Sequence, residues 1–246
     1  MTNEDSPTNR DMATTMALLW GTRPAPSRGR KPGMTINEIV ATAVAIADAD
    51  GLGALSMRRV ADALGVGTMS LYRYLPGKAE LYALMLDAVM GEGQPEPDAH
   101  GWRENLENVA RRSLDGYRRH PWLLDTSLSR GLVGPNQAAV LDKLLAMLAG
   151  TGLTNGRKMA VIGLLTGYVQ GRARQFAEAA RTQHRSGASD AQFWQEFAPL
   201  LDPHLDRFPT LAAVWRDDEL TWEDEFEFGL QRVLDGIETY IDEGDK

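Results

Sequence analysis

The 246-residue chain contains no cysteine. This absence excludes disulfide bonds, thiolate zinc sites and cysteine nucleophiles, and it fits a reducing compartment such as the cytoplasm. Long apolar runs are also missing. The most hydrophobic stretch, MAVIGLLTGYVQG at 159–171, lies between basic residues and is shorter than the roughly 20 residues that span a membrane. MALLW at 16–20 is too short for a signal-peptide core. We therefore expect a cytoplasmic protein without a membrane segment.

Motifs of common enzymes are absent as well. The chain has no G-x-S-x-G elbow, no phosphate-binding G-x-x-x-x-G-K loop and no H-E-x-x-H metal motif. Its four histidines are scattered without the paired spacing of metal ligands: His100, His120, His184 and His204. We therefore expect neither catalysis, nor a metal site, nor a cofactor.

Strand signals are also missing, since no segment alternates apolar and polar residues among β-branched side chains. Helical spacing occurs along most of the chain instead. The expected fold is all-α, with a three-helix helix-turn-helix head followed by a C-terminal helical bundle. The first 33 residues are rich in Asn, Asp, Ser, Thr and Pro, and this composition predicts a flexible N-terminal arm at 1–33.

Charge is distributed unevenly. The whole chain has a formal net charge of -8, yet residues 23–80 carry eight basic and five acidic residues, and DDELTWEDEFE at 217–227 is densely acidic. An acidic body with a mildly basic head indicates that only the head contacts a polyanion such as nucleic acid. Arg28, Arg30 and Lys31 of the arm could add contacts to such a partner.

The head shows clear helix boundaries. Thr35 followed by Glu38 forms a capping box before a helix that Gly51 ends. Ser56 is the predicted N-cap of a second helix. A turn at Gly65–Gly67 leads to a third helix at 68–75, and a fourth follows at 78–90 after Pro76-Gly77.

The third helix has two different faces. At 100° per residue Leu71 and Leu75 share one side, which we expect to be buried. The outward side chains can donate hydrogen bonds to phosphates, contact base edges and pack against thymine methyl groups. They are Thr68, Met69, Ser70, Tyr72, Arg73 and Tyr74. This composition is typical of a helix that enters the major groove of DNA.

The stretch LSMRRVADALGVGTMSLYRYLPGKAELYALML resembles the DNA-binding domain of the TetR family of bacterial transcriptional regulators. The resemblance implies a DNA-binding domain at 34–90 and contacts to a double-stranded operator through nine residues: Ser56, Arg58, Thr68, Met69, Ser70, Tyr72, Arg73, Tyr74 and Lys78. HPWLLDTSLSRGLVGPNQAAVLDKLLAMLAGTGL, GYVQGRARQ and FEFGLQRVLDGIE are similar to the C-terminal domain of the tetracycline-repressor branch. That similarity implies a ligand-binding and dimerisation domain at 91–246.

Helices are expected throughout this second domain, at 102–119, 122–129, 135–149, 155–184 and 222–242, with a broken helix at 190–201. Gly163, Gly167 and Gly171 recur every four residues and would let another backbone approach closely. The last helix carries an apolar stripe: Phe226, Leu230, Val233, Leu234, Ile237 and Tyr240. By the family resemblance, these two helices form the interface of a homodimer.

Aromatic residues are frequent between the linker at 91–101 and the last helix. We expect part of this set to line an apolar pocket for a small-molecule effector, the candidates being Trp102, Tyr117, Trp122, Leu132, Met147, Tyr168, Arg172, Phe176 and Trp194. Tetracycline-binding relatives have a histidine where this chain has Tyr168, so a magnesium-chelated tetracycline is not expected. The predicted protein is a ligand-responsive DNA-binding repressor. The alternatives are a sensor or protein-interaction module without DNA binding and, in last place, an enzyme.

Overall fold

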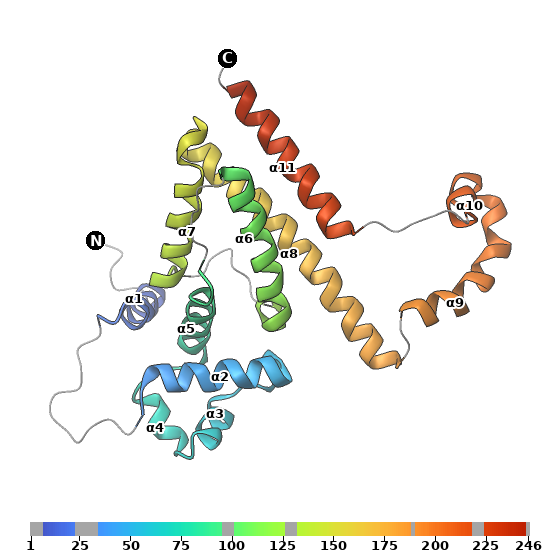
Figure 1. The fold of residues 1–246 in the computed structure, drawn as a ribbon. Coiled ribbons are helices and arrows are strands. Elements are labelled where there is room, and N and C mark those ends of the chain that lie inside the picture. The colour runs from blue at the N-terminus through green and yellow to red at the C-terminus, as the bar shows by residue number, and fades with distance from the viewer. Residues whose placement is uncertain are drawn as a thin grey trace.

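The computed structural model describes residues 7–22, 34–94, 101–125, 132–187, 190–217 and 224–244. Across these ranges every regular element is helical and no strand occurs, which confirms the all-α prediction. Figure 1 shows a small head of short helices at one end, a bundle of longer helices in the middle and a separate pair of helices to one side. In the described part of the chain no helix is both long and apolar enough to cross a membrane.

Four helices form the head: α2 (Ile36–Asp50), α3 (Met57–Ala63), α4 (Thr68–Tyr72) and α5 (Lys78–Met90). The predicted capping box is present, because the Glu38 N–H donates to Thr35 Oγ1 at 3.2 Å and the Thr35 N–H donates to Glu38 Oε2 at 2.6 Å. Ser56 caps α3 by accepting the Arg59 N–H at 3.2 Å. These caps hold α2 and α3 at their predicted boundaries, whereas α4 ends at Tyr72 and not at residue 75 as predicted.

Part of the segment that we expected to be a flexible arm is helical. Helix α1 (Pro7–Leu19) precedes the head and packs against α5. Thr15, Leu18 and Leu19 are buried, which is the spacing of one helix face. The polar composition of residues 1–33 as a whole concealed this short apolar stripe. Residues 23–33, with Arg28, Arg30 and Lys31, lie outside the described residues.

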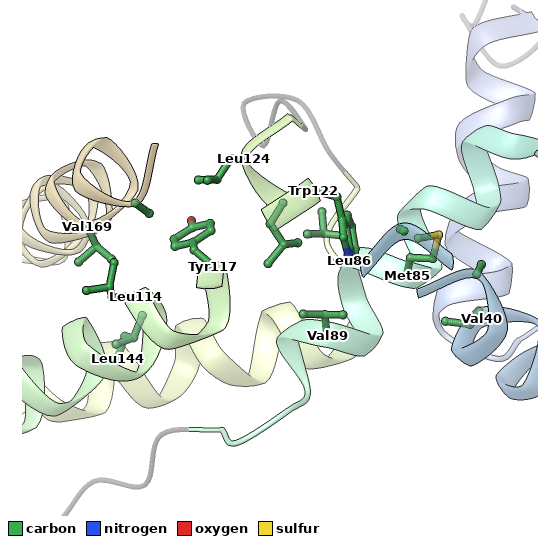
Figure 2. Close-up of a cluster of buried hydrophobic side chains, with 14 of the residues drawn as sticks. Val40, Met85, Leu86, Val89, Leu114, Tyr117, Trp122, Leu124, Leu144 and Val169 are labelled. Carbon is green, nitrogen blue, oxygen red and sulfur yellow. The ribbon is translucent and has the colours of Figure 1, made fainter. Parts of the chain in front are cut away.

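The body consists mainly of α6 (Trp102–Arg119), the 3-10 helix η3 (Pro121–Asp125), α7 (Pro135–Met147), α8 (Asn155–Ser186) and α11 (Glu225–Gly244). One apolar core runs through the head and the body without a break. Figure 2 shows this continuity from Val40 and Met85, through Val89 of α5, to Leu144 and Val169. Because α5 contributes to both parts, it is the mechanical link between them.

The apolar stripe of α11 lies within its own protomer. Phe226, Leu230, Leu234 and Ile237 are buried, and α11 packs on α6 and α8. The stripe that we assigned to the dimer contact is therefore used inside the chain. The outer surface of α11 instead exposes Phe228 and, less fully, Tyr240.

A second difference concerns the region between α8 and α11, where we expected only a broken helix at 190–201. The structure contains α9 (Asp190–Leu201), the 3-10 helix η6 (Asp202–Arg207) and a further helix, α10 (Pro209–Trp215). Pro199 lies inside α9, and the rings of Trp194 and Trp215 meet edge to face at 5.6 Å. Figure 1 shows this pair of helices apart from the body.

Candidate nucleic-acid interface and internal cavity

Helix α4 presents a polar and aromatic surface with an apolar back. Leu71 and Leu75 are fully buried, as the helical spacing predicted. Met69 is 77% exposed, and Tyr72 and Arg73 are also exposed. Thr68, Ser70 and Tyr74 are half-buried. The two leucines therefore fix the helix to the head, while the side chains suited to DNA contact face away from the core.

The turn before α4 depends on glycine. Gly65 has a φ of 67°, in the left-handed region that side chains with a Cβ rarely adopt. Gly67 is the N-cap of α4 and is extended, with no side chain to cover the first backbone N–H groups of the helix. The turn thus reverses the chain between α3 and α4, which pack against each other, and it leaves the beginning of α4 accessible.

The remaining predicted DNA contacts surround α4. Arg58 at the start of α3 is exposed, and its pairing with Asp62 at 3.8 Å is loose because both side chains are solvated. Lys78 at the start of α5 is exposed, with its ammonium 5.1 Å from the centre of the Tyr82 ring. Ser56 is exposed beside the Arg59 N–H that it caps. All nine predicted residues thus come from the contiguous stretch 56–78, and each is at least partly accessible.

The body contains a partly open cavity of about 180 Å³ between the end of α5, α6, η3, α7 and α8. Its wall is mostly aliphatic, and six of its members are Leu106, Val109, Leu144, Ile162, Leu165 and Val169. One end is polar and carries Glu92, Arg119 and His120. A small apolar interior with a few converging polar groups is the usual composition of a small-molecule site.

Tyr117 lies between this cavity and an open groove. Burial raises the pKa of its hydroxyl above the ordinary value, and the charge of Arg174 partly offsets that effect. Trp122 and Phe176 line the open groove, on the other side of Tyr117. Arg172 lies against Phe176 in a further surface hollow and pairs with Glu225 of α11. Four of the nine predicted effector residues thus lie at hollows of the body.

The other five predicted effector residues lie elsewhere. Met147 is buried in the core of α7, and Trp102 is half-buried against the same core. The Tyr168 hydroxyl donates to the Phe226 carbonyl at 2.7 Å, and its ring stacks on Phe226, so it joins α8 to α11. Leu132 lines none of the described hollows, and Trp194 belongs to the separate α9–α10 pair.

Sequence reasoning missed most of the cavity wall. Leu106, Leu144, Ile162 and Val169 occur at ordinary helical spacing, so their pattern is the same as that of residues that only pack the core. The two polar residues His120 and Glu92 gave no signal either, because they are 28 positions apart in the chain. Only the tertiary fold brings them together.

Known families match both parts of the chain. Residues 39–85 match the family described as bacterial regulatory proteins, tetR family, and residues 94–241 match the tetracyclin repressor-like C-terminal domain. The HTH-type transcriptional repressor DrrR1 of Streptomyces coeruleorubidus is 46% identical over 94% of this chain and 87% of its own length. An HTH-type transcriptional regulator of Saccharopolyspora erythraea is 32% identical over 87% of this chain and 89% of its own length.

Solved structures agree with these matches. Apo ActR from Streptomyces coelicolor superposes with a TM-score of 0.68 and 28% identity, covering 87% of this chain and 99% of ActR. ActR in complex with actinorhodin gives the same TM-score and identity over 83% of this chain and 95% of ActR. A third structure holds ActR in complex with (S)-DNPA, with a TM-score of 0.64 at 28% identity, over 82% of this chain and 96% of ActR.

Proposed function

The chain belongs to the TetR family of bacterial regulatory proteins, and from that premise we propose that it is a repressor released from a near-palindromic operator by a small apolar or amphipathic molecule. The observation that carries the proposal is the two-sided helix α4. Leu71 of this helix and Leu75 just after it are buried in the head, whereas the side chains of Met69, Tyr72 and the C-cap residue Arg73 face solvent. A helix of this kind fits the major groove, which is about 12 Å wide.

Residues 34–90 act as the DNA-binding domain and residues 91–246 as the ligand-binding and dimerisation domain. Within the head, we assign the base edges to Thr68, Met69, Ser70 and Arg73, and the DNA backbone and thymine methyl groups to Tyr72 and Tyr74. Ser56, Arg58 and Lys78 hold phosphates, which fix the orientation of the head on the duplex. Because the regulator acts on the bacterial chromosome, its location is cytoplasmic.

The protein works as a homodimer, so that two heads contact half-sites about one helical turn of DNA, roughly 34–36 Å, apart or somewhat further. The outer face of α8 supports this assembly. Gly163, Gly167 and Gly171 are exposed, and nothing within the protomer lies within 4 Å of where a Cβ would stand. Packing inside one chain therefore does not require these glycines, whereas close approach by a partner helix does.

The internal cavity supports the ligand part of the proposal. It lies directly beside α5, the helix that joins the head to the body. Ligand pockets usually measure about 300–1,000 Å³, so the cavity of about 180 Å³ must widen to hold an effector of ordinary size. Widening moves its walls, and α5 moves with them. ActR, a relative with the same fold, has been solved with actinorhodin and with (S)-DNPA.

The experiment that tests DNA recognition uses operator fragments selected from genomic DNA by the wild-type protein. Arg73→Ala should weaken binding about fivefold or more in fluorescence anisotropy, because one good base contact contributes roughly 1–3 kcal/mol. Tyr72→Ala should also weaken binding, through the loss of its contact to the DNA backbone or a thymine methyl group. Wild-type binding should also weaken steeply with salt. Arg216→Ala removes the same charge at the C-cap of the distant α10 and is the matched control. Wild-type affinity in Arg73→Ala at an unchanged melting temperature would show that α4 does not read DNA.

A further inference from the structure

The polar end of the cavity already holds a carboxylate. Glu92 Oε2 accepts from Arg119 Nη1 at 2.9 Å and lies 3.1 Å from His120 Nε2. Arg119 and Glu92 are partly solvated, whereas the His120 side chain is only 8% exposed. An Arg119 N–H and the His120 Nε2 atom thus converge on one carboxylate oxygen, at a point where Arg119 and Glu92 are partly exposed.

That carboxylate lies just beyond the last helix of the head. Glu92 directly follows the end of α5 at Gly91, whereas Arg119 and His120 end α6 in the body. The other nitrogen of the same ring, His120 Nδ1, lies 2.7 Å from Asp48 Oδ1 of α2. The Trp122 indole N–H donates to the same Asp48 oxygen at 2.7 Å. The link from the end of α5 and the link from α2 therefore meet at the His120 ring.

We propose that the anionic group of an amphipathic effector takes the place of the Glu92 carboxylate on Arg119 and His120, and that the loss of this Glu92 link frees the end of α5 and with it the DNA-binding head. The inference rests on the proposed function and adds to it the chemical class of the effector and the residues that detect it. Glu92 acts as an internal stand-in for the anion of the effector.

The charges around the cavity favour an anion over a cation or a neutral group. Arg112 and Arg119 both line it, and Glu92 is the one carboxylate among its lining residues. When an effector displaces Glu92, the two guanidinium groups remain, and charge-assisted hydrogen bonds from such donors are about twice as strong as neutral ones. The aliphatic wall holds the apolar part of the same molecule. The expected effector is therefore an apolar molecule with a carboxylate, sulfonate or acidic hydroxyl at one end.

Competition between Glu92 and the effector for the same nitrogen atoms predicts the direction in which a Glu92 substitution changes effector affinity. If the effector must displace Glu92, removal of the Glu92 charge makes effector binding tighter and makes the head insensitive to it, because coupling between two sites is reciprocal. A purely structural role for Glu92 predicts the opposite, since a loosened cavity binds every ligand less tightly. The two explanations therefore differ in the direction of the change in effector affinity.

The test compares two fluorescent probes that differ by one anionic group, 1-anilinonaphthalene-8-sulfonate and N-phenyl-1-naphthylamine, on the full-length dimer. We expect the sulfonate to bind wild type about tenfold more tightly than the uncharged probe, and Arg119→Gln to remove that difference. Only the sulfonate should weaken operator binding. Glu92→Gln should bind the sulfonate about three- to tenfold more tightly than wild type, and its operator affinity should no longer respond to it.

Asp142→Asn is the matched control, because it removes a carboxylate from the exposed side of α7, outside this cluster. Equal affinity of wild type for the two probes overturns the proposal, as does a Glu92→Gln variant that binds the sulfonate no more tightly than wild type. The proposed function fails separately, if the wild type binds no selected operator fragment. The comparison of the two probes needs no DNA, so it still decides whether the anion site exists.

Discussion

The recognition helix α4 and the cavity differ in where their binding side chains lie, on the surface in α4 and on inner walls in the cavity. Helix α4 and the residues just after it expose several neighbouring side chains, and in the stretch 68–75 only Leu71 and Leu75 are fully buried. The cavity is concave, and residues between 89 and 169 on five separate elements form its walls. On α4, packing and binding therefore belong to different residues. In the cavity the same side chains do both, so its shape cannot change without moving the core.

The first prediction tests whether packing and DNA binding on α4 depend on different residues. Leu71→Ala removes a fully buried side chain and leaves a void behind the recognition helix, so the free energy of unfolding should fall by about 2–5 kcal/mol. Urea unfolding followed by circular dichroism measures this change. Operator binding should fall as well, because the helix is no longer held in place.

Met69→Ala is the variant to compare with Leu71→Ala, because Met69 lies on the opposite face of the same helix. Because Met69 is 77% exposed, this substitution should change the free energy of unfolding by less than about 0.5 kcal/mol. Operator binding alone should weaken. If Met69→Ala destabilised the protein as strongly as Leu71→Ala, the two faces of α4 would not be separate in function.

The same contrast explains which features could be predicted from the sequence. The α4 face, the Thr35–Glu38 capping box and the Ser56 cap depend on residues within four positions of one another, so helical periodicity and capping rules suffice. Helix α1 was missed because its stripe is short within a polar segment. The contact between His120 and Glu92 depends on how η3, α5 and α6 meet, and no local pattern encodes that meeting.

The aromatic residues show the same limit. Tyr117 was expected at a pocket and lies at one, whereas Tyr168 packs on Phe226 of α11. Both are aromatic residues on amphipathic helices, and the sequence does not say whether the facing helix lies close enough to cover the ring. Whether such a residue lines a hollow or fills the core is decided by the distance between helices, which is a tertiary property.

The second prediction concerns a junction of the body where packing and polar contacts coincide. Asp87 of α5 is buried and accepts the Gln137 N–H at 3.0 Å and the Asn136 side-chain N–H at 3.2 Å, so it caps the beginning of α7. A Cβ on Gly134 would stand 2.3 Å from Asp87 Oδ1. Gly134→Ala should therefore displace this carboxylate and lower the free energy of unfolding by about 1–3 kcal/mol.

Gly150→Ala provides the comparison in thermal and urea unfolding, because nothing lies within 4 Å of where its Cβ would stand. That variant should keep the stability of the wild type. A second expected consequence of Gly134→Ala is weaker operator binding, since Asp87 joins the helix that carries the head to α7. If Gly134→Ala were as stable as wild type, the Asp87 carboxylate could move aside at little cost in free energy. The contact between α5 and α7 would then be less rigid than the structure indicates.

The smallest expected effect comes from an ion pair that ties α11 to α6. Arg111 Nε donates to Glu227 Oε1 at 2.8 Å, and this hydrogen bond holds the pKa of Glu227 below its ordinary value although desolvation acts in the opposite direction. A carboxylate with a lowered pKa in the folded state stabilises the protein fully above its ordinary pKa, and that contribution is lost as the pH falls through the lowered pKa. The Glu227 side chain is 40% exposed, so solvent screening keeps the contribution near 0.5 kcal/mol.

Glu227→Gln should therefore lower the free energy of unfolding by roughly 0.5 kcal/mol at pH 7, and this difference from wild type should vanish at acid pH, where Glu227 is protonated. Urea unfolding of both proteins across that pH range measures the difference, with the exposed Glu243→Gln on the same helix as the control. A difference that stays constant with pH would mean that Glu227 stabilises α11 through packing and not through its charge. In that case α11 would resemble α4, where the buried side chain of Leu71 packs the helix against the head.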